Sequence, residues 1–124
     1  TLNANDNLAY ALEMMARDIR MGTSFFAPLE DQLSFLSYRN EAIVYRLNNE
    51  TLERSVSGGE FEPMTAQGVR VKKLSFNLAG EKRYDNQQIK ITIKMKISSK
   101  FSSQEVINNL QTTISPRNLE TGTI

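Results

Sequence analysis

The most regular stretch of the sequence is Ile89-Lys90-Ile91-Thr92-Ile93-Lys94-Met95-Lys96-Ile97-Ser98. Apolar and polar residues alternate strictly along it. Because successive side chains of a β-strand point to opposite faces, this period of two predicts a half-buried antiparallel strand over residues 88–98. The isoleucines and Met95 form its buried face, and the lysines form a solvated, cationic outer face.

Strand signals continue on both sides of this stretch. Residues 43–47 and 51–56 flank Asn48-Asn49-Glu50, and Asn tolerates positive φ, which predicts a β-hairpin. Between residues 69 and 78 the alternation changes phase at Lys72-Lys73, which indicates a bulge or a break between two short strands. A last strand is expected over residues 106–114, with an inward face made of Val106, Leu110 and Ile114.

A single helix is predicted ahead of the strands, over residues 6–21. Its apolar stripe has spacings of four, three and four, in Leu8, Leu12, Met15 and Ile19. Gly22 supplies a stop. One helix followed by five to seven antiparallel strands predicts an α+β fold, with the N-terminal helix packed on a curled antiparallel β-sheet. We expect one domain over residues 1–124, with strands over about 33–114 and a frayed tail over 119–124.

Composition excludes several kinds of chemistry. The 124 residues contain no Cys and no His. This excludes disulfide scaffolds, Cys–His zinc sites, Cys nucleophiles and imidazole proton shuttles. Glu60 and Glu62 are better explained as a solvated strand face than as an acid–base pair. Asp85-Asn86-Gln87 is better explained as a turn between strands than as a Ca²⁺-binding loop. We therefore expect no enzymatic activity, no catalytic or metal residues and no cofactor, although a Ser–Lys hydrolase stays an open alternative.

Charge is divided unevenly along the chain. The formal net charge is +1, yet residues 70–100 carry nine basic and two acidic residues, whereas residues 1–69 carry five basic and ten acidic ones. The candidate partner or polyanion face consists of Lys72, Lys73, Lys82, Arg83, Lys90, Lys94 and Lys96. The simpler interpretation is a lysine-rich face that keeps a strand from mispairing. Arg17 and Arg20, at the helix end, are either ion-paired with neighbouring acids or contacts to another subunit.

Seven short stretches, in one order, carry a resemblance to a known family. They are residues 15–22, 33–35, 44–47, 51–55, 74–76, 89–97 and 110–118, so the similarity spans about residues 8–118. Together they resemble the globular part of type IV pilin-like proteins, in particular the J-type minor pseudopilins of type II secretion and the W-type minor pilins. The family's cleaved leader and its apolar N-terminal helix are not among these residues.

The resemblance implies a function and a location. It implies a pilin-like fold and a non-catalytic structural subunit of a type IV pilus or a type II secretion pseudopilus. Its partners would be other minor pilins or pseudopilins and the major pilin. The domain would lie on the periplasmic side, anchored in the inner membrane by an upstream helix of which residues 6–21 are the soluble half. The alternative is a DNA-binding minor pilin used in natural transformation, which would bind nucleic acid through the lysine-rich strand face.

Overall fold

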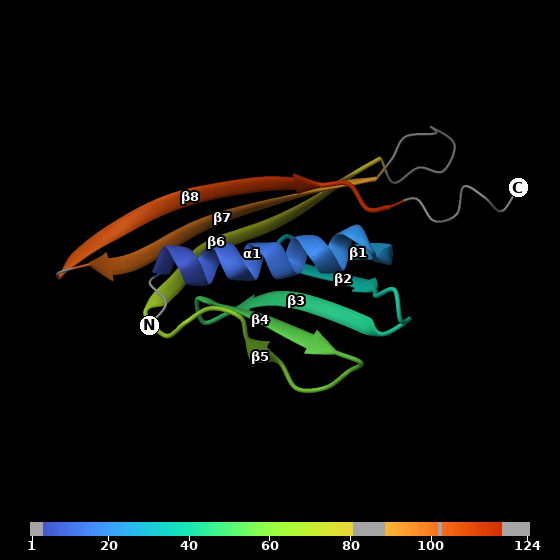
Figure 1. Cartoon of the computed structure of the whole chain (residues 1–124), viewed down its shortest axis with the longest axis horizontal. Helices are drawn as coiled ribbons and strands as arrows, with labels where there is room; N and C mark the ends of the chain where they lie inside the picture. Colours follow the sequence, from blue (N-terminus) through green and yellow to red (C-terminus); the bar gives the residue numbers. More distant parts are fainter. Residues whose placement is uncertain (1–3, 81–88, 102, 118–124) are drawn as a thin grey trace, which may run out of the picture.

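The computed structural model describes residues 4–80, 89–101 and 103–117, which form one helix and two antiparallel sheets (Figure 1). The helix α1 covers Ala4–Arg20. Sheet A contains β1 (Thr23–Leu29), β2 (Gln32–Leu36), β3 (Ala42–Asn48), β4 (Thr51–Val56) and β5 (Glu62–Pro63), in that order. Sheet B contains β6 (Val69–Ala79), β7 (Lys90–Phe101) and β8 (Gln104–Ile114), with β7 in the middle.

The predicted fold class, an α+β domain with the helix packed on one curled sheet, is wrong. The described chain is mostly β, with two separate sheets and one short helix. Strand periodicity shows which side chains are buried, but it does not show which strands share hydrogen bonds. The strand β1 was not expected either, because the strands were predicted to begin at about residue 33. It contains Pro28 and pairs with β2 through two register shifts.

The hairpin predicted in sheet A is confirmed. β3 and β4 pair from Ile43↔Val56 to Asn48↔Thr51. The two turn residues between them, Asn49 and Glu50, have φ values of 50° and 64°. Two consecutive positive φ angles give a turn whose twist matches that of the flanking strands, which explains the tight connection.

The phase change predicted at Lys72-Lys73 is a bulge inside one long strand. β6 pairs with β7 at Val71↔Ile97 and again at Lys73↔Lys96, with the register shift between them. One extra residue on β6 thus restores the inward direction of Leu74, which is buried. The expected strand over residues 88–98 corresponds to β7, whose alternation holds: Ile91, Ile93, Met95 and Ile97 are buried.

The inward face expected for the last strand is only partly confirmed. Ile114 is buried and Leu110 is half-buried against the core, whereas the Val106 side chain is 41% exposed. Val106 pairs with Ser99 and so lies on the same face of sheet B as Leu110 and Ile114. It is exposed because alternation along a strand fixes the face of a side chain, but not whether another element covers it.

The helix runs along the line where the two sheets meet (Figure 1). Its stripe is buried as expected at Leu8, Met15 and Ile19, and Leu12 packs against the same core. This core combines side chains of both sheets, including Phe35 and Tyr45 of sheet A and Ile93 of sheet B. At about 1.5–3 kcal/mol for each fully buried apolar side chain, this shared core is the main source of stability.

Two turns of sheet A also hydrogen-bond to the outer edge of β6. The Val71 N–H donates to the carbonyl of Glu50, in the β3–β4 turn, at 2.8 Å. The Phe76 N–H donates to the carbonyl of Glu30, in the β1–β2 turn, also at 2.8 Å. These bonds satisfy part of an edge that would otherwise be open, and they place Glu50 beside the basic residues of β6.

Candidate interaction surface

Four lysines gather on the outer face of sheet B. Lys90, Lys94 and Lys96 alternate with buried residues of β7, and Lys73 lies on the same face of β6; all four are exposed. We call this set the lysine face. None of the four forms an ion pair with another residue in the part of the chain that the structure describes. Lys82 and Arg83, which were predicted to extend it, lie outside the described residues.

The lysine face contains a direct like-charge contact. Lys73 is the register partner of Lys96 on the neighbouring strand. Directly opposed side chains on one sheet face have Cβ atoms about 4.5–5.5 Å apart, and like charges there are destabilising. The other register partners of these lysines include Ser75, Asn109 and Gln111, which are uncharged. The described register partners of these four lysines therefore do not compensate the repulsion, and Glu105, the acid on this face, is opposite Lys100.

Lys72 does not belong to the lysine face, contrary to the sequence-based expectation. Its Nζ lies 2.8 Å from Glu50 Oε2, and Arg70 Nη1 lies 3.7 Å from Glu50 Oε1. The hydrogen bond from Lys72 is the main cause that lowers the pKa of Glu50. Because the β6 bulge separates Lys72 from Lys73, the two neighbours have different roles: Lys72 ties β6 to the β3–β4 turn, and Lys73 faces solvent.

The predicted contacts at the helix end are exposed. Arg17 forms an i,i+4 ion pair with Glu13 at 3.7 Å, with side chains that are 76% and 74% exposed. Such a pair contributes only a few tenths of a kcal/mol. Arg20 is exposed, and its carbonyl oxygen accepts a hydrogen bond from the Arg117 N–H at 2.8 Å. Both side chains are accessible, so a subunit contact through Arg17 and Arg20 stays a prediction.

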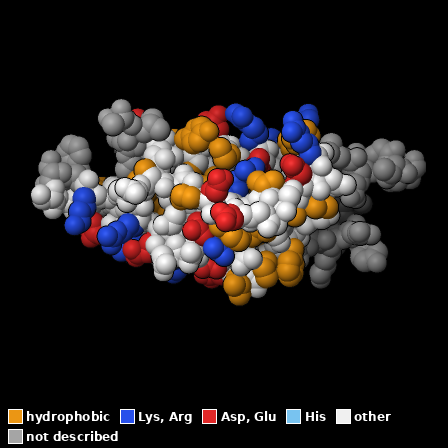
Figure 2. All heavy atoms as spheres, turned by 90° about the horizontal axis from the view of Figure 1, so that it is seen from below, with side chains coloured by type: hydrophobic (Ala, Val, Ile, Leu, Met, Phe, Trp, Pro, Cys, Tyr) orange, Lys and Arg blue, Asp and Glu red, His pale blue; other side chains and the backbone are white. Residues whose placement is uncertain are grey.

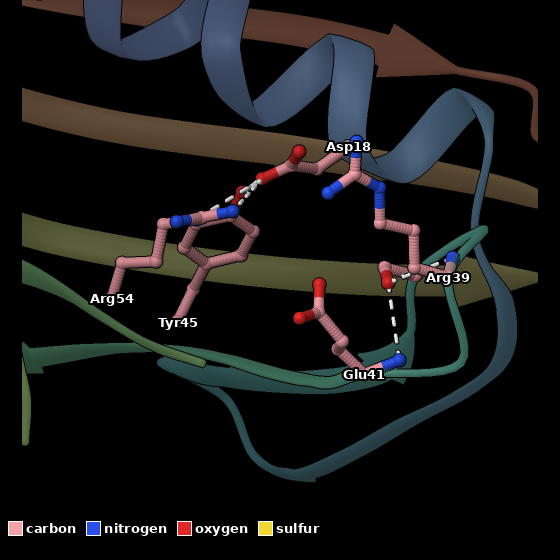
Figure 3. Close-up of polar contacts among 6 residues, drawn as sticks. Asp18, Arg39, Glu41, Tyr45 and Arg54 are labelled. Carbon is pink, nitrogen blue, oxygen red and sulfur yellow. Dashed lines mark hydrogen bonds and ion pairs between the residues drawn. The ribbon is translucent and has the colours of Figure 1, made fainter. Parts of the chain in front are cut away.

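Asp18 has a structural role that was not expected from the sequence. Its carboxylate accepts a hydrogen bond from the Tyr45 hydroxyl, and Arg54 approaches the same oxygen with Nε at 3.1 Å and Nη2 at 3.0 Å (Figure 3). The three residues come from α1, β3 and β4, so this cluster fixes the helix on sheet A. No local signal could have found it, since each partner is more than 25 positions from Asp18 and only the fold brings them together.

The environment of this cluster shifts two pKa values. Burial, followed by the hydrogen bond to Asp18, raises the pKa of Tyr45 far above its usual value. Burial lowers the pKa of Arg54, but the charge of Asp18 and the contacts with Tyr45 raise it by more, so the net pKa is raised. Tyr45 thus stays protonated and Arg54 charged over the ordinary pH range, which is typical of a structural cluster rather than of an acid–base pair.

A hollow of about 660 Å³ lies between α1 and the segment that leads into β5. Tyr10, Met14 and Met64 provide apolar lining, Glu60 and Glu62 provide carboxylates, and Arg54, which is paired with Asp18, is the one basic residue of the lining. We call it the acidic groove. Neither glutamate forms an ion pair with another described residue. From the side that bears β5, acidic and apolar side chains lie together over the middle of the face (Figure 2).

Metal-ligand clusters and membrane-spanning helices are both absent from the described residues. No group of three or more acidic side chains in this part of the chain could hold a metal ion. Asp85-Asn86-Gln87, the loop weighed for Ca²⁺, lies outside it. Within the same residues, no helix is both long enough and apolar enough to cross a membrane.

Comparisons with known proteins do not identify a family. No family model, no curated protein and no solved structure matches the chain. The resemblance to pilin-like proteins therefore stays a prediction carried by the seven short stretches of sequence.

Proposed function

We propose that the chain is a non-catalytic structural subunit that acts by binding neighbouring subunits, in an assembly of the type IV pilus or type II secretion pseudopilus class. Its lysine face would bind the acidic groove of the next subunit. The observation that carries this proposal is the lysine face itself: four exposed lysines, two of them directly opposed, with no acidic partner among the described residues.

The spacing of the two surfaces supports the pairing. Lys94 and Lys96 are two residues apart on one strand face, which separates them by about 7 Å. Glu60 and Glu62 are also two residues apart and line one groove. Their Cα atoms are therefore at most about 7 Å apart, which matches the lysine spacing. Two different surfaces of one chain that complement each other form a head-to-tail contact, which repeats from subunit to subunit and gives an open filament where its rotation does not close into a ring.

An acidic protein surface suits the lysine face better than nucleic acid does. Proteins that bind single strands usually combine basic residues with aromatic side chains on which bases stack. The described register partners of the lysines are Ser75, Ala79, Asn109 and Gln111, together with the opposed lysines themselves, and none is aromatic. DNA binding is therefore the rival that the experiment has to exclude.

The test uses two charge-neutralised variants, Lys94→Gln/Lys96→Gln and Glu60→Gln/Glu62→Gln. Sedimentation is measured near 0.01 M and near 0.15 M salt, where the Debye length falls from about 30 Å to about 8 Å. The unchanged chain should associate more strongly at low salt, and each variant alone should lose about 0.4–2 kcal/mol of association, from two exposed pairs at about 0.2–1 kcal/mol each.

Mixing the two variants makes the test specific. Lys94→Gln/Lys96→Gln keeps an intact acidic groove, and Glu60→Gln/Glu62→Gln keeps an intact lysine face. The mixture should therefore form 1:1 pairs that do not extend further. Glu13→Gln, which removes only the exposed pair with Arg17, is the matched control and should associate like the unchanged chain. If the mixture stays monomeric while the unchanged chain, but not Lys94→Gln/Lys96→Gln, shifts single-stranded DNA at low salt, the assembly proposal is wrong and the DNA-binding alternative takes its place.

A further inference from the structure

β8 is an outer strand with one edge that no other described strand pairs. It pairs along its whole length with β7 and lies at the margin of sheet B (Figure 1). The other outer strands are protected. β1 has two register shifts and a proline, β5 is two residues long and ends in Pro63, and β6 is bound by two turns of sheet A. Register shifts, proline, short length and covering contacts are the usual devices that stop an edge from pairing further.

In residues 106–114, β8 has no register shift and no proline, and no turn of sheet A donates a backbone hydrogen bond to it, although α1 packs against this strand. These nine residues, Val-Ile-Asn-Asn-Leu-Gln-Thr-Thr-Ile, contain no charge, no proline and no glycine. Their pairing with β7 runs without a register shift from Ile91↔Ile114 to Ser99↔Val106. Val106 and Ile107 are 41% and 47% exposed. A long, regular and uncharged edge with exposed apolar residues is a template for strand addition.

The order of the residues indicates which strand fits this edge. Read outward from Leu110 in both directions, residues 106–114 have the same polarity at three of the four positions and share β-branching at the other. Polar residues come first on both sides, as Asn109 and Gln111, and then Asn108 and Thr112. β-branched residues follow, as Ile107 and Thr113, and the ends are apolar, Val106 and Ile114. Such a palindrome is complementary to itself when two copies run antiparallel.

We propose that β8 binds β8 of a second copy of this chain, antiparallel and about a two-fold axis at Leu110, so that two three-stranded sheets become one of six strands. Val106 then faces Ile114 of the second copy, and Asn109 faces Gln111 of the second copy. Val106 and Ile114 then form an apolar pair on the inner face, and Asn109 and Gln111 form an amide pair on the outer face. Between them Asn108 faces Thr112 and Ile107 faces Thr113. Matched cross-strand pairs of this kind stabilise a sheet. The same surface patch on both copies makes the contact isologous, so it closes at two subunits.

This contact is independent of the proposed assembly. It uses neither the lysine face nor the acidic groove, and no charged residue lies in residues 106–114. Dimerisation through β8 should therefore depend little on salt, whereas the head-to-tail contact should weaken as salt rises. Either contact can fail in solution without the other.

Disulfide trapping tests the register, because the chain contains no cysteine of its own. Opposed residues of antiparallel strands have Cα atoms about 4.5–5.5 Å apart, within the range that a disulfide spans. The variants are Ile107→Cys and Thr113→Cys, both on the exposed outer face of β8, one of them carrying a mass tag. A 1:1 mixture under mild oxidation should give the mixed disulfide-linked dimer.

Each variant alone serves as the control. In the proposed register Ile107 lies six residues along the strand from Ile107 of the second copy, a separation of about 20 Å, so neither variant alone should link. Leu110→Cys lies on the axis and should link to itself. Circular dichroism checks that each variant keeps the unchanged fold. If the mixture does not link, or if each variant alone links as fast as the mixture, the proposal is wrong.

Discussion

Replacing Asp18 by Ala should weaken the attachment of α1 to sheet A more than any other single loss of charge on the helix. The substitution leaves the Tyr45 hydroxyl, fully buried, without its acceptor. An unsatisfied buried hydroxyl costs about 1–3 kcal/mol. The ion pair with Arg54, whose side chain is 28% exposed, adds less than about 1 kcal/mol. We expect a total loss of about 2–3 kcal/mol.

Urea and thermal denaturation measure this loss directly. With an unfolding entropy of about 2.1 cal/mol/K per residue, 2–3 kcal/mol corresponds to a fall in Tm of about 8–12 °C. Tyr45→Phe removes the hydroxyl, so Asp18→Ala in that background should cost only about 0.5–1 kcal/mol, because no orphaned donor remains. The difference between the two backgrounds is the coupling energy of the Asp18–Tyr45 contact.

The matched control is Glu13→Ala, which removes a solvent-exposed pair on the same helix and should stay within about 0.5 kcal/mol of the unchanged chain. Two results would refute the reasoning. One is a loss for Asp18→Ala no larger than that of Glu13→Ala. The other is an equal loss for Asp18→Ala with and without the Tyr45→Phe substitution, which would mean that the hydroxyl is satisfied in another way.

Other contacts support three further predictions. Burial and Asp18 raise the pKa of Tyr45 and keep its hydroxyl protonated in the folded state, whereas an unfolded tyrosine ionises near pH 10.0. The free energy of unfolding should therefore fall as pH rises above 10. Tyr45→Phe should reduce that fall, as measured by denaturation at about pH 8 and 11. Gly22→Ala should cost about 1–3 kcal/mol in thermal denaturation, since a Cβ there would lie 2.5 Å from Phe35 Cδ2; Gly68→Ala, with open space around it, is the control. Lys73→Glu should raise the free energy of unfolding by about 0.2–1 kcal/mol, because the new carboxylate would pair with Lys96, and the gain should be smaller at high salt. An unchanged or lower free energy of unfolding would contradict the like-charge contact.

Residues 89–97 show how far sequence reasoning extends for this chain. Their period of two predicted the buried isoleucines and the exposed lysines, which is confirmed in β7, whereas Ile89, ahead of the strand, is only half-buried. The stripe from Leu8 to Ile19 and the turn at Asn49-Glu50 were predictable for the same reason: local periodicity and local φ preferences act within a few residues. The bulge was visible as a phase change, although the sequence left open whether the strand bends or breaks.

The partners of those elements were not predictable. Lys72 and Lys73 look alike in sequence, yet one binds Glu50 and the other faces Lys96, because a bulge and a turn more than 20 residues away decide between them. Asp18 looked like one member of a charge cluster on the helix, and its partners come from β3 and β4 instead. The division into two sheets depends equally on contacts between distant segments.

The sequence by itself determined the buried stripe of the helix, the buried face of β7, the turn at Asn49-Glu50 and where the charge is concentrated. The tertiary structure alone decided which strands share a sheet, which acid neutralises which base, and which edge is left without a partner among the described strands. The physical reason is one of range. Burial preference and turn geometry belong to a residue and its immediate neighbours, whereas hydrogen-bond and charge partners are set by which distant surfaces the shared core brings together.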